Sequence, residues 1–268
     1  MGSFFSYGFL REAMVVAVIG GTICGLLGVL VVLWRMSLVG ILISHAAFAG
    51  SLMALWLGFP PMAGGLTASL GAASIVGPLS ERPGFTPDTA MGIIFSVMLS
   101  LAMLALGLLP GAKTEGLGLI WGSILTTTRV DLWAMSITGL GLLFFIIFCF
   151  KEIQAIIGHR QAALAAGIPV RAIYFISLGI MGLTVALALK AIGGLLIYSL
   201  IVTPAATALQ LTYNLKAMFW LSGLSGAVSS ALGLYLSFKL GLPVGAAIVL
   251  VSVFFLVLAL FFFNKEKR

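Results

Sequence analysis

His45 is the residue of this sequence best suited to bind a substrate, because it stands alone in a long apolar segment. From Met36 to Gly50 no other side chain is ionisable. Ionisable groups inside a bilayer cost roughly a few kcal/mol on insertion scales and are often retained for function. A neutral imidazole can ligate a metal ion, but one imidazole is too few for a closed site. Spacing alone leaves two roles open: a ligand on a pathway, or a structural histidine that donates to Ser44 or to a helix carbonyl.

The composition is that of a membrane protein. Of 268 residues, 62% are hydrophobic and 8% are charged, whereas a soluble domain has roughly 25% charged residues. No linker rich in proline or serine, and no polar block, divides the chain. We therefore expect residues 1–268 to form a single integral membrane domain of the all-α class.

Membrane-spanning helices are predicted wherever an apolar run reaches the roughly 20 residues that a bilayer requires. Nine such runs are found, at residues 13–33, 37–57, 60–80, 89–110, 131–150, 172–189, 191–211, 217–238 and 243–263. Lys190 is the only charge between the sixth and seventh runs, and Gly193 and Gly194 follow it. The sequence therefore predicts eight or nine spanning helices.

The basic residues predict the orientation of the chain. With nine spans, nine of the fourteen Lys and Arg residues fall on one side and five on the other. The richer side is cytoplasmic by the positive-inside rule, which places the N-terminus outside and the C-terminus in the cytoplasm. The net charge of +7 is spread singly between apolar runs, so no nucleic-acid partner is expected.

The chain carries neither a coupling-ion site nor a catalytic site of a recognisable kind. All seven carboxylates fall at span ends, in connections or in the C-terminal tail, whereas ion-driven carriers usually need carboxylates within the membrane. No GxxxxGK[ST] phosphate loop is present, so ATP hydrolysis would need a separate subunit. The sequence contains no paired nucleophile and base, no carboxylate pair and no HExxH motif. It therefore does not indicate an intramembrane enzyme.

Two connections are more than turns. The outer one contains Leu117–Leu125, an apolar stretch that is too short to span and is typical of a re-entrant or interfacial helix. The inner one, Lys151–Arg171, contains the strong helix former Ala162–Ala166, which is followed by Gly167 and Pro169 as stop signals. Such a cytoplasmic helix could dock a motor subunit, and an ordinary amphipathic surface helix is the alternative.

Four stretches carry a resemblance to a known family over nearly the whole chain. The chain resembles the permease subunits of ABC transporters that import zinc, manganese or iron with a cluster A-I binding protein. The stretches are Met36–Gly50, Asp88–Ser96, Gly122–Leu125 followed by Asp131 and Leu132, and Gly193–Ala208 with its Pro-Ala-Ala-Thr-Ala motif.

The resemblance implies a complex in the plasma membrane of a prokaryote. It implies two copies of this permease, two ABC ATPase subunits that bind ATP-Mg, and an extracytoplasmic metal-binding protein, while the permease itself binds no cofactor. It also places site residues: Ser44 and His45 on the substrate pathway, a helix break at Gly193, Gly194 and Pro204, and ATPase contacts at Ala163, Ala166, Gly167, Ile168 and Pro169.

Two departures from the family pattern bear on the substrate and on the motor. The family commonly has an aspartate four residues before the histidine, on the same helix face, where this chain has Ile41. It also has His159-Arg160-Gln161 where acidic residues are usual. The metal site is thus supported at His45 and not at Ile41. A free divalent ion is the first expectation, an importer of chelated metal is the second, and a non-transporting scaffold or sensor is the third.

Overall fold

The computed structural model describes residues 8–34, 36, 38–80, 82–108, 129–192 and 197–262, and every regular element in these ranges is a helix. The helices are α1 (Gly8–Leu33), α2 (Val39–Trp56), α3 (Pro61–Ser80), α4 (Pro87–Leu108), α6 (Arg129–Phe148), α7 (Phe150–Gly158), α8 (Arg160–Ala165), α9 (Val170–Ile192), α10 (Ile197–Leu211), α11 (Leu215–Leu240) and α12 (Val244–Phe262). The predicted all-α membrane class is confirmed.

The helices match the predicted spans closely. Eight of the described helices are long and apolar enough to cross a bilayer, and the 15-residue α10 is a shorter ninth apolar helix. Lys190 lies on α9, so the two runs around it form separate helices. Gly193, Gly194 and the predicted re-entrant stretch 117–125 lie outside the described residues.

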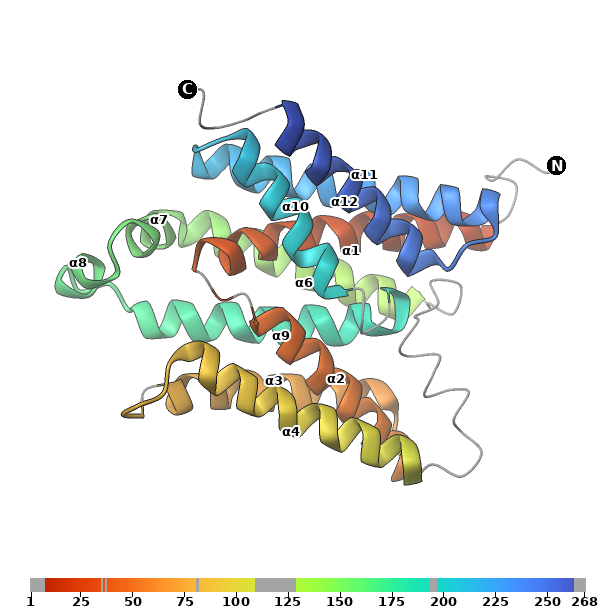
Figure 1. Ribbon diagram of the computed structural model, residues 1–268, viewed down its shortest axis with the longest axis horizontal. Helices are drawn as coiled ribbons and strands as arrows, with labels where there is room; N and C mark the ends of the chain where they lie inside the picture. Colours follow the sequence, from red (N-terminus) through yellow and green to blue (C-terminus); the bar gives the residue numbers. More distant parts are fainter. Residues whose placement is uncertain are drawn as a thin grey trace.

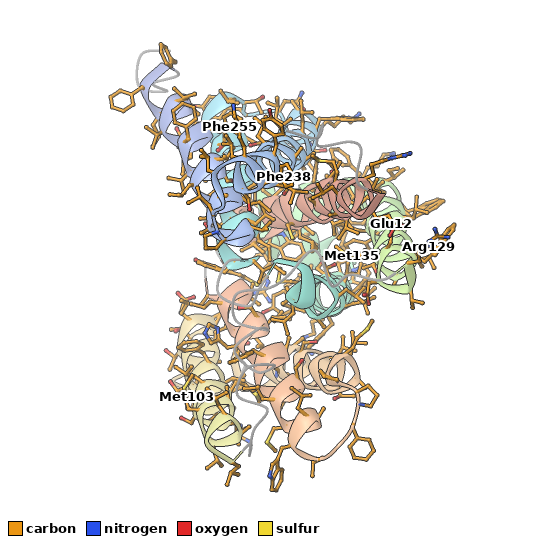
Figure 2. The ribbon with its side chains drawn as sticks, turned by 90° about the vertical axis from the view of Figure 1, so that its right-hand side faces the viewer. Glu12, Met103, Arg129, Met135, Phe238 and Phe255 are labelled. Atoms are coloured by element: carbon orange, nitrogen blue, oxygen red, sulfur yellow. The ribbon has the colours of Figure 1, made fainter. Side chains whose placement is uncertain are left out.

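The helices form two groups with α9 between them (Figure 1). Helices α2, α3 and α4 pack together on one side of α9, and α1, α10, α11 and α12 pack together on the other. The short helices α7 and α8 lie at one end of the bundle, and α1 begins at the opposite end. At that opposite end Glu12 of α1 and Arg129 of α6 form an exposed ion pair, Oε1 to Nε 3.4 Å (Figure 2).

Small residues allow a close contact between α1 and α11. A Cβ atom added at Gly226 would overlap the carbonyl oxygen of Gly21, and one added at Gly25 would overlap that of Ser222. The Ser222 hydroxyl also donates to the Gly25 carbonyl at 2.6 Å. In lipid, where apolar side chains gain little by leaving the solvent, such close backbone approach drives helix association. These contacts hold the two helices together along much of their length.

Helix α10 differs from the prediction at one residue. It continues through Pro204, where a break was expected. Proline fixes φ near the helical value, so a helix can contain it at the cost of one backbone hydrogen bond. Pro204 is buried, and neighbouring helices support such a residue in a membrane. The missing bond thus weakens α10 locally without interrupting it.

We expect Gly226→Ala to destabilise the protein by about 1–3 kcal/mol, because the added methyl group overpacks the contact with α1. Thermal unfolding in detergent, followed by size-exclusion chromatography, measures the change. Gly141→Ala is the matched control, since nothing lies within 4 Å of a Cβ at that helical position. Equal melting temperatures for the two variants would show that the close approach at Gly226 does not hold the helices together.

Candidate functional site

His45 lies near the start of α2, on the only strip of that half of the helix that is not buried. Ile41 and His45 are four residues apart and partly exposed, whereas the three residues between them are buried. Residues with this spacing share one helix face. His45 is six residues, or about 9 Å, into the helix. The start of α2 lies toward the end of the bundle that carries α7 and α8 (Figure 1).

A hydrogen bond to the Ile41 carbonyl orients the imidazole. The Ile41 carbonyl oxygen lies 2.8 Å from Nδ1 of His45 and accepts a second bond from the Ser44 hydroxyl at 2.9 Å. A carbonyl oxygen can only accept, so Nδ1 must carry the proton. In the neutral ring the lone pair is then on Nε2. Metal-binding histidines are held in the same way, with the other ring nitrogen donating to a carbonyl or carboxylate.

Aromatic rings from two other helices border this part of α2. The Phe95 ring of α4 meets the imidazole edge to face, with ring centroids 4.9 Å apart. The Tyr198 ring of α10 lies against Gly40, where a Cβ atom would come within 2.9 Å of Cδ2. The Phe95 ring makes the surroundings of the imidazole apolar on the side that faces α4.

Among the described residues, the site offers one nitrogen ligand and no carboxylate. In the described helices that could span the membrane, acidic side chains occur only near the helix ends, at Glu12, Asp88 and Asp131. Within the same described residues no three His, Cys, Asp or Glu side chains gather as a metal site would require. A cation at His45 would therefore complete its coordination with water, with its own chelator or with ligands from a second chain.

The second candidate region is the connection from α7 to α9. Helix α8 ends at Ala165, Ala166 follows it, and Gly167 has φ +79°, the left-handed conformation in which glycine is favoured. Pro169 immediately precedes α9. The predicted helix and its stop signals are therefore confirmed.

This connection is held to the bundle on one face and open on the other. Ile153 of α7 is fully buried and Ala163 of α8 is 3% exposed, whereas Leu164 is 51% exposed. Ile168, partly buried, packs against the apolar core. The predicted motor-contact residues thus divide into an anchoring set, Ala163 and Ile168, and an exposed set, Ala166, Gly167 and Pro169.

The comparisons with known proteins identify the family. The model of the ABC 3 transport family matches residues 6–263. The chain belongs to this family. It is 31% identical to "Manganese transport system membrane protein MntC" of Halalkalibacterium halodurans. The alignment of 261 residues covers 97% of this chain and 89% of the relative. It is 29% identical to "Chelated iron transport system membrane protein YfeD" of Yersinia pestis, which covers 96% and 86%.

A solved structure has the same fold. "PsaBC from Streptococcus pneumoniae in complex with Fab" matches with a TM-score of 0.88 and 29% identity, covering 99% of this chain and 97% of that one. The predicted family, a multi-pass membrane permease with a transport function, is therefore confirmed. The metal-import prediction agrees with relatives that are named for manganese and iron.

The sequence predicted His45 and Ser44 but not the rings beside them. The structure brings Phe95 and Tyr198 to the histidine segment from α4 and α10. Pro204 lies six residues beyond Tyr198 on α10 and is buried. The only feature of the sequence that could have pointed to Tyr198 was its place in the family motif around residues 193–208. Phe95 had no signal beyond its place in the Asp88–Ser96 stretch.

We expect the imidazole of His45 to carry its proton on Nδ1, which nitrogen NMR of histidine-labelled protein can measure. His159→Gln removes the one other histidine of the chain, so a single ring is observed. At pH 8 the spectrum should show a protonated Nδ1 and an unprotonated Nε2. A protonated Nε2 would contradict the proposed ligand atom.

Proposed function

We propose that this chain is the membrane subunit of an ATP-driven importer that carries a divalent metal ion past His45. The observation that carries the proposal is the orientation of the imidazole, which donates Nδ1–H to the Ile41 carbonyl and leaves Nε2 as a lone-pair ligand inside a membrane helix. Relatives named for manganese and iron transport support the choice of metal.

The cation would bind His45 weakly, as transport requires. A pathway site must bind a substrate well enough to admit it and loosely enough to release it. One imidazole without a neighbouring carboxylate meets the second requirement. The expected ions are zinc, manganese and iron, and imidazole nitrogen suits zinc and iron better than manganese, which prefers oxygen ligands.

The energy would come from ABC ATPase subunits that bind ATP-Mg and dock on the exposed part of the α7–α9 connection. Gly167 and Pro169 are exposed there and fix the angle at which α8 joins α9. Because α9 packs against α2 and α3, a displacement of α8 can reach the helix that carries His45. An extracytoplasmic metal-binding protein would deliver the ion at the opposite end of the bundle.

The assembly would contain two copies of the permease in the plasma membrane of a prokaryote. A second copy would allow two imidazoles to share one ion, which compensates for the absence of an aspartate at position 41. The N-terminus would be outside and the C-terminus in the cytoplasm. This orientation agrees with the basic residues of the α7–α9 connection, since cytoplasmic connections are enriched in Lys and Arg.

We expect His45→Ala to abolish accumulation of the transported ion, because the substitution removes the only imidazole in the segment. Cells that express the permease with its ATPase and binding protein are offered zinc, manganese or iron, each free or chelated, and cell metal is measured by mass spectrometry. Ser74→Ala is the matched control. The Ser74 hydroxyl is exposed and donates only to the carbonyl of Gly71 in its own helix, so accumulation should be unchanged.

Two results would overturn this assignment. Undiminished accumulation of the free ion by the His45→Ala variant would show that the imidazole is not a pathway ligand. Accumulation of chelated metal alone would show that the substrate brings its own ligands. Protein level in the membrane is measured in parallel, so that loss of transport is not confused with loss of the protein.

We expect Gly167→Val to uncouple the motor from transport. A β-branched residue at φ +79° costs about 1–2 kcal/mol, and relief of that strain would change the angle between α8 and α9. ATP hydrolysis stimulated by the loaded binding protein should fall in vesicles that contain the complex. Gly158→Ala, at a helical position with open space around a Cβ, should keep the parental activity, and equal activities would contradict the coupling role.

A further inference from the structure

The exposed part of the α7–α9 connection combines a basic flank with an apolar tip. Lys151, Arg160 and Arg171 have exposed side chains. The one carboxylate of the connection, Glu152, has its Oε2 atom buried without a hydrogen-bond partner among the described atoms. The charge presented outward by this segment is therefore positive.

Arg160 and Leu164 occupy the same face of α8, because they are four residues apart. Leu164 is 51% exposed, whereas the adjacent Ala163 is 3% exposed. Cation and apolar side chain are thus presented together, on the face turned away from the bundle. A complementary surface needs an apolar floor for Leu164 and negative charge beside it for Arg160.

The position of α8 favours a protein over a lipid surface as the partner. Figure 1 shows α8 projecting beyond the ends of α6 and α9, which it connects through α7 and the Gly167 turn. A segment that extends past the helix ends is directed at the aqueous phase. Lys151 and Arg171, nearer the helix ends, are better placed to meet lipid headgroups.

We propose that α8 selects its ATPase subunit by charge, fitting a cleft with an apolar floor and an acidic rim that pairs with Arg160. This inference rests on the proposed docking of the ATPase. Charge complementarity at an interface rim governs association rate, salt dependence and the exclusion of wrong partners. The pairing would therefore distinguish the cognate ATPase from other ABC ATPases in the same cell.

The test measures binding of the purified cognate ATPase subunit to the permease in nanodiscs of neutral phosphatidylcholine. We expect Arg160→Glu to weaken binding about tenfold, because it reverses the charge. Arg160→Lys keeps the charge and should retain most of the binding. Parental binding should weaken as NaCl rises from about 50 to about 500 mM, through screening of the pair, whereas binding by Arg160→Glu should lose this dependence.

Two further variants separate this inference from the docking proposal. Arg82→Glu reverses an exposed arginine in the turn between α3 and α4, at the same end of the bundle (Figure 1), and should bind like the parent. Leu164→Ser tests docking itself and should weaken binding at every salt concentration. Loss with Leu164→Ser but not with Arg160→Glu would overturn the charge pairing and leave docking intact.

The remaining outcomes also decide the question. Equal weakening by Arg82→Glu and Arg160→Glu would show a general electrostatic attraction and contradict a specific acidic rim. If neither Leu164→Ser nor Arg160→Glu changes binding, both docking at α8 and the charge pairing are overturned. An effect of Arg160→Glu that appears only in nanodiscs of anionic phosphatidylglycerol would assign Arg160 to lipid and contradict the inference.

Discussion

Every polar group that these helices carry into the bilayer needs a hydrogen-bond partner within the protein, because hydrocarbon offers none. Several hydroxyl groups meet this need by donating to a carbonyl of their own helix, as Thr22 does to Val18 and Thr184 to Ile180. His45 follows the same rule and donates Nδ1–H to the Ile41 carbonyl. An imidazole has a second nitrogen, so satisfying the first leaves a nitrogen lone pair free to bind a metal ion, which a hydroxyl cannot provide.

Close backbone contacts determine which part of α2 is held most firmly. At the middle of the helix, a Cβ atom at Gly50 would overlap the carbonyl oxygen of Gly64 in α3, and the converse holds for Gly64. Near the start of the helix the neighbours are instead the aromatic rings of Tyr198 and Phe95. Rings can turn or shift where backbones in contact cannot. The histidine therefore lies in the part of α2 that is bordered by aromatic side chains, not in the part where the backbone of α3 comes close.

The sequence predicted the structural features that depend on the local pattern of residue types. A bilayer imposes a minimum span length, so uninterrupted apolar runs predicted the spanning helices to within a few residues at most ends, and Gly167 with Pro169 predicted the end of α8. His45 could be predicted because it is the only ionisable side chain of its segment. The neighbours of His45 depend on tertiary packing: nothing distinguishes Phe95 among nineteen phenylalanines. Pro204 was predicted to break a helix because local propensity says nothing of the support that neighbouring helices give.

The sparse ligand set at His45 also limits where the driving force for transport can arise. A ligand shifts a conformational equilibrium only by the difference between its affinities for the two states. If a cation binds through one imidazole, or through two in a paired assembly, as proposed, it would gain too little at this site to drive the opening and closing of a bundle held by contacts such as that of Gly226 with Gly21. The difference in free energy has to enter elsewhere. Helix α8 is suited to receive it, because it is exposed on one face and joined through Gly167 to α9, which packs against α2.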